Sequence, residues 1–448
     1  MEREVGFAGL SHLGLVSSLV SAAKGCRVVA YDPRTSWCQA LSRGELPIAE
    51  PGLAELLAAH ADRIHFTSDA ADMARCPLLI VSVDTPTDNE DCGDPSVAAR
   101  LAEEAFARAA ANTTVVIQSQ VPPGFTRGLA ARVAGQASRR ELAVFCQVET
   151  LIIGQAVERA LHPERIMIGC ADPRAPLPAV YLEWLQKFGC PIMQMRYESA
   201  EVAKLAVNLF LAASVCTTNT LAELCEAIGA DWSDIMPALA ADRRIGPYAY
   251  LKPGLGLSGG NLERDLTAFQ ALARRMGTHT AVVEAYRSNS RHRRNWACEA
   301  LRREAADGEL AVGVWGVAYK PDTDSTRNSP ALALLEAVGP WPVRVYDPVV
   351  RLEPGRWPFA LQAPSALEAC RDVDALVVMT PWVEFASVDV AAVRSLMRGR
   401  LVLDPFGVLD GERCRSVGLR YRRLGVRETG ARVVGKPARR RNVSTQSV

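Results

Sequence analysis

A short glycine-containing turn near the start of the chain has the spacing of a nucleotide-binding loop. The hexapeptide GLSHLG, residues 9–14, ends an apolar run and precedes a helical pattern. Gly9 would permit a tight turn, Gly14 would permit close packing of helix on strand, and the free helix amides would attract a diphosphate. Asp32, which closes the next apolar run, could accept hydrogen bonds from an adenosine ribose. The pattern predicts an NAD site and disfavours NADP, whose 2′-phosphate would meet a carboxylate.

Ser11 occupies the middle position of this turn, where a glycine would let the backbone approach the diphosphate. Its β-carbon predicts an altered affinity or pose for NAD. A turn of the same kind that binds no nucleotide is the alternative interpretation.

Two further groups of polar residues could perform acid/base chemistry. Lys204 and Asn208 are four residues apart in a predicted helix, hence on one face, where both could reach one substrate atom. The stretch GLSGGNLERD, residues 256–265, joins a glycine-rich loop to the carboxylate of Asp265 but contains no strong nucleophile. An ammonium suits stabilisation of a developing oxyanion, and a carboxylate suits proton acceptance. A solvated helix face would show the same Lys and Asn spacing without a catalytic role.

The segments that hold these residues alternate between β-branched runs and helical patterns, which indicates βαβ units and a parallel sheet. Predicted strands include VGFAG, RVVAYD, LLIVSVDTP, TTVVIQSQVP and ELAVFCQVE, and a second series comprises LAVGVWGVAY, VRVYDP, ALVVMTP and RLVLDPF. Between them lie a long predicted helix at residues 199–227 and Arg-rich helical sequence around 287–303. We expect an α/β protein with two Rossmann-like doubly wound parallel-sheet domains joined by a long central helix.

Length and composition exclude several classes of protein. A chain of 448 residues exceeds one ordinary core, and 51 Lys and Arg nearly balance 50 Asp and Glu. No net charge therefore points to nucleic acid or to a membrane surface. The twelve cysteines are scattered, with neither a CxxC pair nor zinc-ligand spacing, so we expect no disulfide framework and no metal site. Reduced thiols fit a cytoplasmic protein.

Two uncharged runs imitate membrane signals. Residues 5–23 contain a histidine with several serines and glycines, and residues 205–222 are interrupted by asparagines and threonines. Buried elements of a globular fold explain both runs better than membrane spans do. We expect no membrane span and no targeting segment.

Segments spread over nearly the whole chain resemble the UDP-glucose and GDP-mannose dehydrogenase family. In family order they are PIAEPGLAELL, VSVDTPTD, QVPPGFTR, ERALHPERIMIG, SAEVAKLAVNLFLA, DRRIGPYAYLKPGLG, GVAYKPDTDSTRNSPAL, YDP and TPWVEF. Each segment alone is weak evidence for the resemblance, but all of them in this order are specific for the family. The resemblance implies an NAD-dependent enzyme that acts on a nucleotide sugar and forms a homodimer.

The resemblance also implies a division of the chain. Residues 1–196 would form the NAD-binding Rossmann domain, and residues 197–303 a central helical domain for dimerisation and the active site. Residues 304–431 would form a C-terminal Rossmann-like domain that binds the nucleotide sugar. Residues 432–448 are basic and polar, and we expect a disordered tail that binds no nucleic acid.

The family resemblance puts the usual chemistry in question at one position. Family members oxidise a sugar C6 alcohol to a carboxylate with two molecules of NAD, and a cysteine traps the intermediate aldehyde. In GLSGGNLERD, Asn261 occupies the position of that cysteine. An amide is no covalent nucleophile, and none of the twelve cysteines lies nearby in sequence. We therefore expect oxidation limited to two electrons.

Other outcomes stay open. A redox-neutral enzyme of the epimerase type would oxidise and then reduce one centre with a cofactor that stays bound. A non-catalytic homologue would bind NAD or a nucleotide sugar only. A uronic acid could still form if a hydrated aldehyde were oxidised without a thioester.

The resemblance implies a role for each retained residue of the catalytic site. Lys204 would stabilise developing negative charge, Asn208 and Asp265 would hold or activate a water, and Glu149 would act as acid/base or position water. Neighbouring positions depart from the family pattern: Gln120 stands in place of threonine, Ile153 in place of an acidic residue and Arg264 in place of lysine.

Further residues are expected at the cofactor and the substrate. Thr85 in VSVDTPTD and Arg327 in the second domain would contact NAD. Lys320 and the glycine-rich loop from Gly256 would contact the sugar nucleotide, and Arg244 would reach the substrate of the partner subunit. Phe406 replaces a family arginine, which would change the recognised diphosphate or sugar, or allow stacking on a base.

Overall fold

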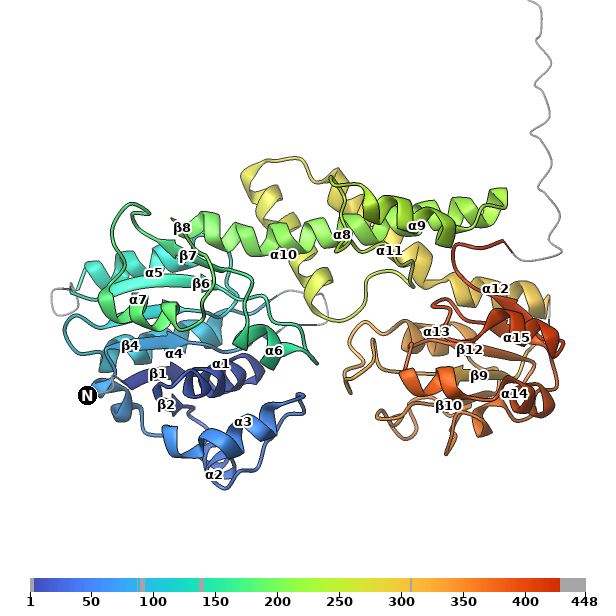
Figure 1. Cartoon of the computed structure of the whole chain (residues 1–448), viewed down its shortest axis with the longest axis horizontal. Coiled ribbons are helices and arrows are strands. Elements are labelled where there is room, and N and C mark those ends of the chain that lie inside the picture. Colours follow the sequence, from blue (N-terminus) through green and yellow to red (C-terminus); the bar gives the residue numbers. More distant parts are fainter. Residues whose placement is uncertain (1–3, 87, 89–92, 137–140, 307, 428–448) are drawn as a thin grey trace, which may run out of the picture. The chain divides into compact units, whose positions relative to one another are not determined.

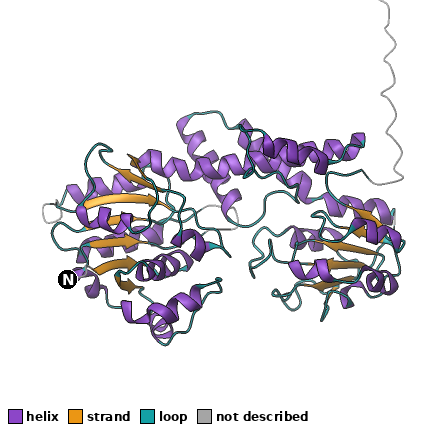
Figure 2. Ribbon diagram, in the orientation of Figure 1, coloured by secondary structure: helices purple, strands orange, loops and turns teal. Residues whose placement is uncertain are grey.

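The computed structural model describes residues 4–86, 88, 93–136, 141–306 and 308–427. These residues form two compact units (Figure 1, Figure 2). The first comprises the residues up to Phe210 together with Gly260–Val283, and the second comprises Leu211–Gly259 and the residues from Glu284 onward. The predicted tail, residues 432–448, lies outside the described residues. The division into four segments at 196/197, 303/304 and 431/432 stays a prediction.

An eight-stranded sheet forms the centre of the first unit, in the order β3-β2-β1-β4-β5-β6-β7-β8. Neighbouring strands pair in parallel except β6 and β7, which are antiparallel. The order reverses between β1 and β4, and doubly wound sheets bind ligands in the crevice at such a point. The strands are β1 (Glu4–Ala8), β2 (Arg27–Tyr31), β3 (Ile64–Thr67), β4 (Leu78–Val81), β5 (Thr114–Ile117), β6 (Ala143–Val148), β7 (Ile166–Cys170) and β8 (Ile192–Arg196).

Helices cover both faces of this sheet because successive strand side chains point to opposite faces. In β2, Val28 and Ala30 join the core cluster beneath α1, α3, α6 and α7, whereas Val29 and Tyr31 join the cluster beneath η2, α4 and α5. The helices of this unit are α1 (His12–Ala23), α2 (Thr35–Ser42), α3 (Leu53–His60), η1 (Ala61–Arg63), η2 (Ala70–Arg75), α4 (Ser96–Arg108), α5 (Phe125–Ala134), α6 (Ala156–Leu161), α7 (Ala179–Gln186) and α10 (Asn261–Met276).

The second unit contains a six-stranded sheet in the order β11-β10-β9-β12-β13-β14, and every pair is parallel. Two core clusters pack on its two faces. The predicted fold class is confirmed. The elements are α9 (Trp232–Ala241), α12 (Trp296–Ala305), β9 (Val312–Trp315), α13 (Pro330–Val338), β10 (Val343–Tyr346), β11 (Ala360–Gln362), η4 (Glu368–Cys370), β12 (Ala375–Val378), η5 (Val383–Ser387), α14 (Val390–Leu396), β13 (Leu401–Leu403), α15 (Gly411–Ser416) and β14 (Arg420–Arg422).

The long helix α8 (Tyr197–Ile228) has 32 residues, begins in the first unit and ends in the second. It confirms the helix predicted at residues 199–227. By length and composition alone it is the one helix in the described part of the chain that could cross a membrane, with 39% of its most apolar window buried. Its Glu201 is buried and accepts hydrogen bonds from Gly124 N at 2.6 Å and Thr126 N at 3.0 Å. This polar contact fits the helix of a globular domain, and the absence of a membrane span stays a prediction.

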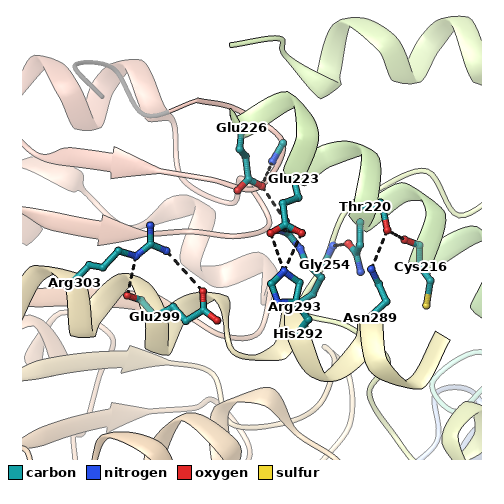
Figure 3. Close-up of polar contacts among 12 residues, drawn as sticks. Cys216, Thr220, Glu223, Glu226, Gly254, Asn289, His292, Arg293, Glu299 and Arg303 are labelled. Carbon is teal, nitrogen blue, oxygen red and sulfur yellow. Dashed lines mark hydrogen bonds and ion pairs between the residues drawn. The ribbon is translucent and has the colours of Figure 1, made fainter. Parts of the chain in front are cut away.

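The Arg-rich segment predicted around residues 287–303 forms two helices, α11 (Ala281–Arg294) and α12, which are separated at Asn295. Within the second unit α11 packs along the second half of α8 through polar contacts (Figure 3). Arg293 is 2% exposed and forms ion pairs with Glu226 at 2.9 Å and Glu223 at 3.6 Å. A buried guanidinium between two carboxylates therefore fixes α11 on α8.

Candidate active site

The first turn of α1 packs against β1 and β4 without space for side chains. Gly9 has a φ of +99°, and a β-carbon on it would lie 2.9 Å from Val83 Cβ. A β-carbon on Gly14 would lie 1.8 Å from Gly9 O and 2.3 Å from Ser82 O. Real β-carbons do not approach other atoms so closely, so only glycine fits either position. The close packing predicted for Gly14 is confirmed.

Ser11 does not leave its hydroxyl free beside this turn. Ser11 Oγ accepts a hydrogen bond from Asp84 N at 2.7 Å, and Asp84 Oδ2 accepts one from Leu13 N at 3.1 Å. A carboxylate from the loop after β4 therefore lies on the first turn of α1. Sequence reasoning missed this contact, because Asp84 lies inside the predicted strand segment LLIVSVDTP and no local pattern links it to Leu13.

Asp32 lies at the carboxyl end of β2, and its side chain is already engaged. Asp32 Oδ2 accepts Leu10 N at 2.9 Å, and the Arg34 guanidinium bonds both carboxylate oxygens at 2.7 and 2.9 Å. Burial opposes ionisation most strongly, but the hydrogen bonds from Arg34 and Leu10 together hold the pKa of Asp32 below its ordinary value. The carboxylate is charged at neutral pH, and its contact with a ribose stays a prediction.

A cavity of about 210 Å³ opens in the first unit at the carboxyl edge of β4, β5 and β6. It extends from the first turn of α1 to the side chains of α8 and α10. All of its lining residues belong to the first unit. Those with polar side chains are His12, Asp84, Thr85, Gln118, Ser119, Gln120, Cys146, Gln147, Glu149, Glu201, Lys204, Asn261 and Arg264. The structure thus brings the expected cofactor contact Thr85 to the same cavity as Glu149, Lys204 and Asn261, and their roles stay predictions.

Asp265 and Asn208 meet directly behind this cavity. Asp265 is fully buried and accepts hydrogen bonds from Asn208 Nδ2, from Gln120 Nε2 at 2.5 Å and from Arg264 Nε at 3.1 Å. Arg264 also donates from its terminal nitrogen to Gln120 Oε1, which closes a three-membered ring of contacts. Two of the residues that depart from the family pattern, Gln120 and Arg264, therefore donate hydrogen bonds to the carboxylate of Asp265.

Burial shifts the pKa values of Lys204 and Glu149, two ionisable groups that line the cavity, in opposite directions. Burial lowers the pKa of the Lys204 ammonium, while the charges of Asp265 and Glu149 oppose this shift. Burial raises the pKa of Glu149, and hydrogen bonds from Thr150 N and Gln118 together with the charge of Lys204 offset only part of it. Lys204 forms no hydrogen bond or ion pair with any residue that the structure describes. Its ammonium can therefore meet a substrate oxygen.

Asn261 is the first residue of α10, is exposed, and lines the cavity. One cysteine also lines it: Cys146 on β6, which is far from Asn261 in sequence and was missed by sequence reasoning. Burial raises the pKa of the Cys146 thiol to about 12. A β-carbon on Gly169 would lie 2.5 Å from Cys146 Sγ, so the sulfur packs tightly against β7. Cys146 is a protonated thiol at neutral pH and a weak nucleophile.

Four residues that the family resemblance assigns to the substrate lie in the second unit: Arg244, Gly256, Lys320 and Phe406. The Arg244 guanidinium is bound by Asp242 at 3.0 and 2.7 Å, and Arg244 is largely exposed. A β-carbon on Gly256 would lie 2.4 Å from Ser290 O, so a packing contact requires this glycine. Phe406 packs against a core cluster of the second unit, and Lys320 lies over the ring of Tyr319.

Arg327 also lies in the second unit, where its backbone oxygen accepts a hydrogen bond from Gly259 N at 3.1 Å. The expected roles of these residues at cofactor and substrate stay predictions. Among the residues that the structure describes, no group of three or more His, Cys, Asp or Glu side chains could hold a metal ion.

Comparison with protein-family models finds three matches in this chain. The NAD binding domain of the UDP-glucose/GDP-mannose dehydrogenase family matches residues 3–185, its central domain matches residues 198–291, and its UDP binding domain matches residues 313–411. The chain is 30% identical to the UDP-glucose 6-dehydrogenase of Pseudomonas aeruginosa over 443 residues, which cover 93% of this chain and 96% of that protein. It is 31% identical to the UDP-glucose 6-dehydrogenase of Haloferax volcanii over 436 residues, with 94% and 100% covered.

Comparison with solved structures also finds similarity to nucleotide-sugar dehydrogenases. The chain is similar to a UDP-glucose dehydrogenase from Pyrobaculum islandicum with a TM-score of 0.82 and 29% identity, covering 94% of this chain and 97% of that one. A UDP-D-ManNAc dehydrogenase from Pyrococcus horikoshii shares the fold with a TM-score of 0.81 at 24% identity, with 94% and 99% covered. The similarity therefore extends over nearly the whole length of each protein.

Proposed function

Because the chain belongs to the UDP-glucose/GDP-mannose dehydrogenase family, we propose that it oxidises a nucleotide sugar with NAD and removes only two electrons from each sugar. It is an NAD-dependent nucleotide-sugar dehydrogenase that acts on a CH–OH group. The restriction to two electrons rests on Asn261, which stands in the cavity where the family resemblance places a thiol.

The cavity fits the cofactor that the family implies. It joins the first turn of α1, through His12 and Leu13, to Lys204 and Asn261. The exclusion of side chains at Gly9 and Gly14 holds the α1 amides at the switch point of the sheet, where a diphosphate would bind. NAD bound there would supply the acceptor for the hydride.

Residues of this chain would assist the loss of the proton and stabilise the charge that develops during alcohol oxidation. A CH–OH group becomes C=O when the carbon loses a hydride to NAD and the oxygen loses a proton. The Lys204 ammonium stabilises the negative charge that develops on this oxygen. Glu149 accepts the proton, because its raised pKa makes it a better base than an ordinary carboxylate. Asp265 accepts three hydrogen bonds and serves to hold Asn208, Gln120 and Arg264 in place.

Further oxidation through a thioester needs a thiolate at the carbonyl carbon. Asn261 has no thiol, and Cys146, the cavity-lining cysteine among the described residues, is protonated and packed against β7. Without that covalent step the aldehyde or ketone leaves as product, and one NADH forms per sugar.

Three alternatives make different products. An epimerase-type enzyme would return the hydride to the sugar and release an isomer without net NADH. Oxidation of a hydrated aldehyde would give a uronic acid and two NADH. A non-catalytic homologue would bind its ligands without turnover. The chain keeps Lys204 in the cavity and the buried hydrogen bond between Asn208 and Asp265, and this retention favours catalysis over binding alone.

Product analysis distinguishes these outcomes. Purified protein is incubated with NAD and a panel of UDP-, GDP- and TDP-sugars, NADH absorbance is followed, and products are identified by mass spectrometry. We expect an aldehyde or ketone with one NADH per sugar, and the same ratio in Cys146→Ser. Abundant uronic acid with two NADH would overturn the proposal, and its loss in Cys146→Ser would assign the thioester to Cys146.

The finer properties of the protein are proposals as well. The match to the UDP binding domain and the names of the relatives support UDP-glucose as the first substrate to test. Exposed apolar side chains on α8, Phe210 at 80%, Leu224 at 52% and Ile228 at 65%, support a homodimer formed through this helix. We propose the cytoplasm as its location, because the described cysteines are all free.

A further inference from the structure

Asp84 places a negative charge where an NAD diphosphate would lie. Its carboxylate accepts Leu13 N at 3.1 Å, in the first turn of α1. Helix amides in the first turn attract anions, and in doubly wound folds this turn holds the cofactor diphosphate. The internal carboxylate and the diphosphate therefore compete for the same donors and repel each other.

The loop that carries Asp84 is fixed at three consecutive residues. Val83 N donates to Ser119 Oγ at 2.8 Å, Asp84 N donates to Ser11 Oγ at 2.7 Å, and Thr85 Oγ1 donates to Gln120 O at 2.5 Å. The backbone thus holds the carboxylate against α1. These contacts also explain Ser11, whose hydroxyl anchors this loop at the position where a glycine would leave the turn bare.

We propose that Asp84 is a built-in competitor of the cofactor diphosphate, held in place by Ser11, that weakens the binding of NAD and NADH alike. The inference rests on the cofactor site of the proposed function, but not on how many electrons the sugar loses. Cofactor binding must displace the carboxylate from Leu13 N, and NADH release is assisted by its return. The consequence is a cofactor that exchanges readily after each turnover.

Calorimetric titration with NAD tests this directly. Asp84→Asn keeps the shape of the side chain and removes its charge, so we expect NAD to bind at least about tenfold more tightly, which corresponds to about 1.4 kcal/mol. Asp84→Ala, which also frees Leu13 N, should change affinity in the same direction. Asp62→Asn removes an exposed charge from η1 and should leave the affinity unchanged.

A ligand without phosphate separates charge from shape. Adenosine, measured by competition, should bind wild type and Asp84→Asn equally, whereas ADP should follow NAD. Unchanged or weaker NAD binding in both Asp84 variants, with melting temperatures like wild type, would overturn the proposal. These binding constants do not depend on how many NADH form per sugar. Failure of the two-electron proposal would therefore not affect the result for Asp84, and failure of the Asp84 proposal would not affect the number of electrons removed.

Discussion

Replacing Asn261 by cysteine should convert a two-electron oxidation into a four-electron one. The new thiol would stand at the first position of α10, exposed to the cavity that also contains Lys204 and Arg264. Its thiolate would add to the aldehyde carbon, a second NAD would take the hydride, and water would release the acid and the thiol. The expected NADH yield rises from one to two per sugar.

The reactivity of this cysteine follows from its surroundings. A free cysteine has a pKa of about 8.5, and helix N-termini and neighbouring cations lower it. A decrease of about one unit, to about 7.5, would raise the thiolate fraction at about pH 7.5 from roughly one-tenth to roughly one-half. The N-terminus of α10 and the cations of Lys204 and Arg264 lower the thiol pKa, whereas the carboxylates of Glu149 and Glu263 oppose this effect, so we expect a net decrease of about one unit.

The assay measures thiol titration and product together. Iodoacetamide labelling of residue 261 is followed against pH by mass spectrometry, in a background where Cys92 and Cys190 are serine. Cys92 lies outside the described residues, Cys190 is partly exposed, and the other cysteines are buried, so labelling elsewhere is slow. Asn261→Ser is the matched control, since a hydroxyl ionises too weakly to trap the aldehyde, and it should still yield one NADH.

Two results would refute the reasoning at different points. If the cysteine titrates at or above about 8.5, the electrostatic argument for α10 and its neighbouring cations is wrong. If it titrates low, the protein binds NAD and substrate, and the yield still stays at one NADH, Asn261 does not occupy the position from which a nucleophile reaches the sugar.

Three other predictions follow from the pKa shifts and the buried ion pairs. Lys204→Met should lower kcat about 10²–10³-fold with little change in the Kd of NAD, because the reaction requires the ammonium. The rate of the wild-type enzyme should fall at an alkaline pH below the ordinary lysine pKa, because burial lowers the pKa of Lys204. Glu149→Gln should raise the melting temperature more at pH 8 than at pH 5. Burial raises the pKa of Glu149 in the folded state, so its contribution to stability is present below the unfolded-state pKa and is lost as the pH rises through the folded-state pKa. Glutamine cannot ionise and loses no stability in this pH range. A melting difference that is equal at both pH values would contradict this. Arg293→Met should cost about 1–3 kcal/mol of unfolding free energy in denaturant titrations, because it removes the buried guanidinium that pairs with the partly buried carboxylate of Glu226. Arg303→Met removes an exposed ion pair and should cost under about 1 kcal/mol.

The sequence predicted those features that short-range patterns encode. β2 alternates between two buried faces, and the spacing of Lys204 and Asn208 on α8 follows the helical period, so strand, helix and shared face were all readable. The strands β11 and β14 have three residues each and carry no such pattern. They become strands because a neighbouring strand pairs with them.

The contacts that shape the site could not be predicted from the sequence, because they join residues that lie far apart along the chain. Gln120 and Asp265 are 145 residues apart, and Asp84 and Leu13 are 71 apart. No periodicity links such positions, because the turn of α1 and the edge of the sheet bring them together only in the folded chain. Cys146 was missed because its neighbours in sequence describe a strand, not a cavity wall.

The ring formed by Gln120, Arg264 and Asp265 also constrains how this site can evolve. Each member satisfies the other two in a buried setting, so any single replacement leaves a donor or acceptor without its partner, at a cost of about 1–3 kcal/mol. Descent from a site with different residues, or return to one, must therefore pass through less stable intermediates or change two positions at nearly the same time. The three residues are an epistatic unit, and their identities should be inherited together.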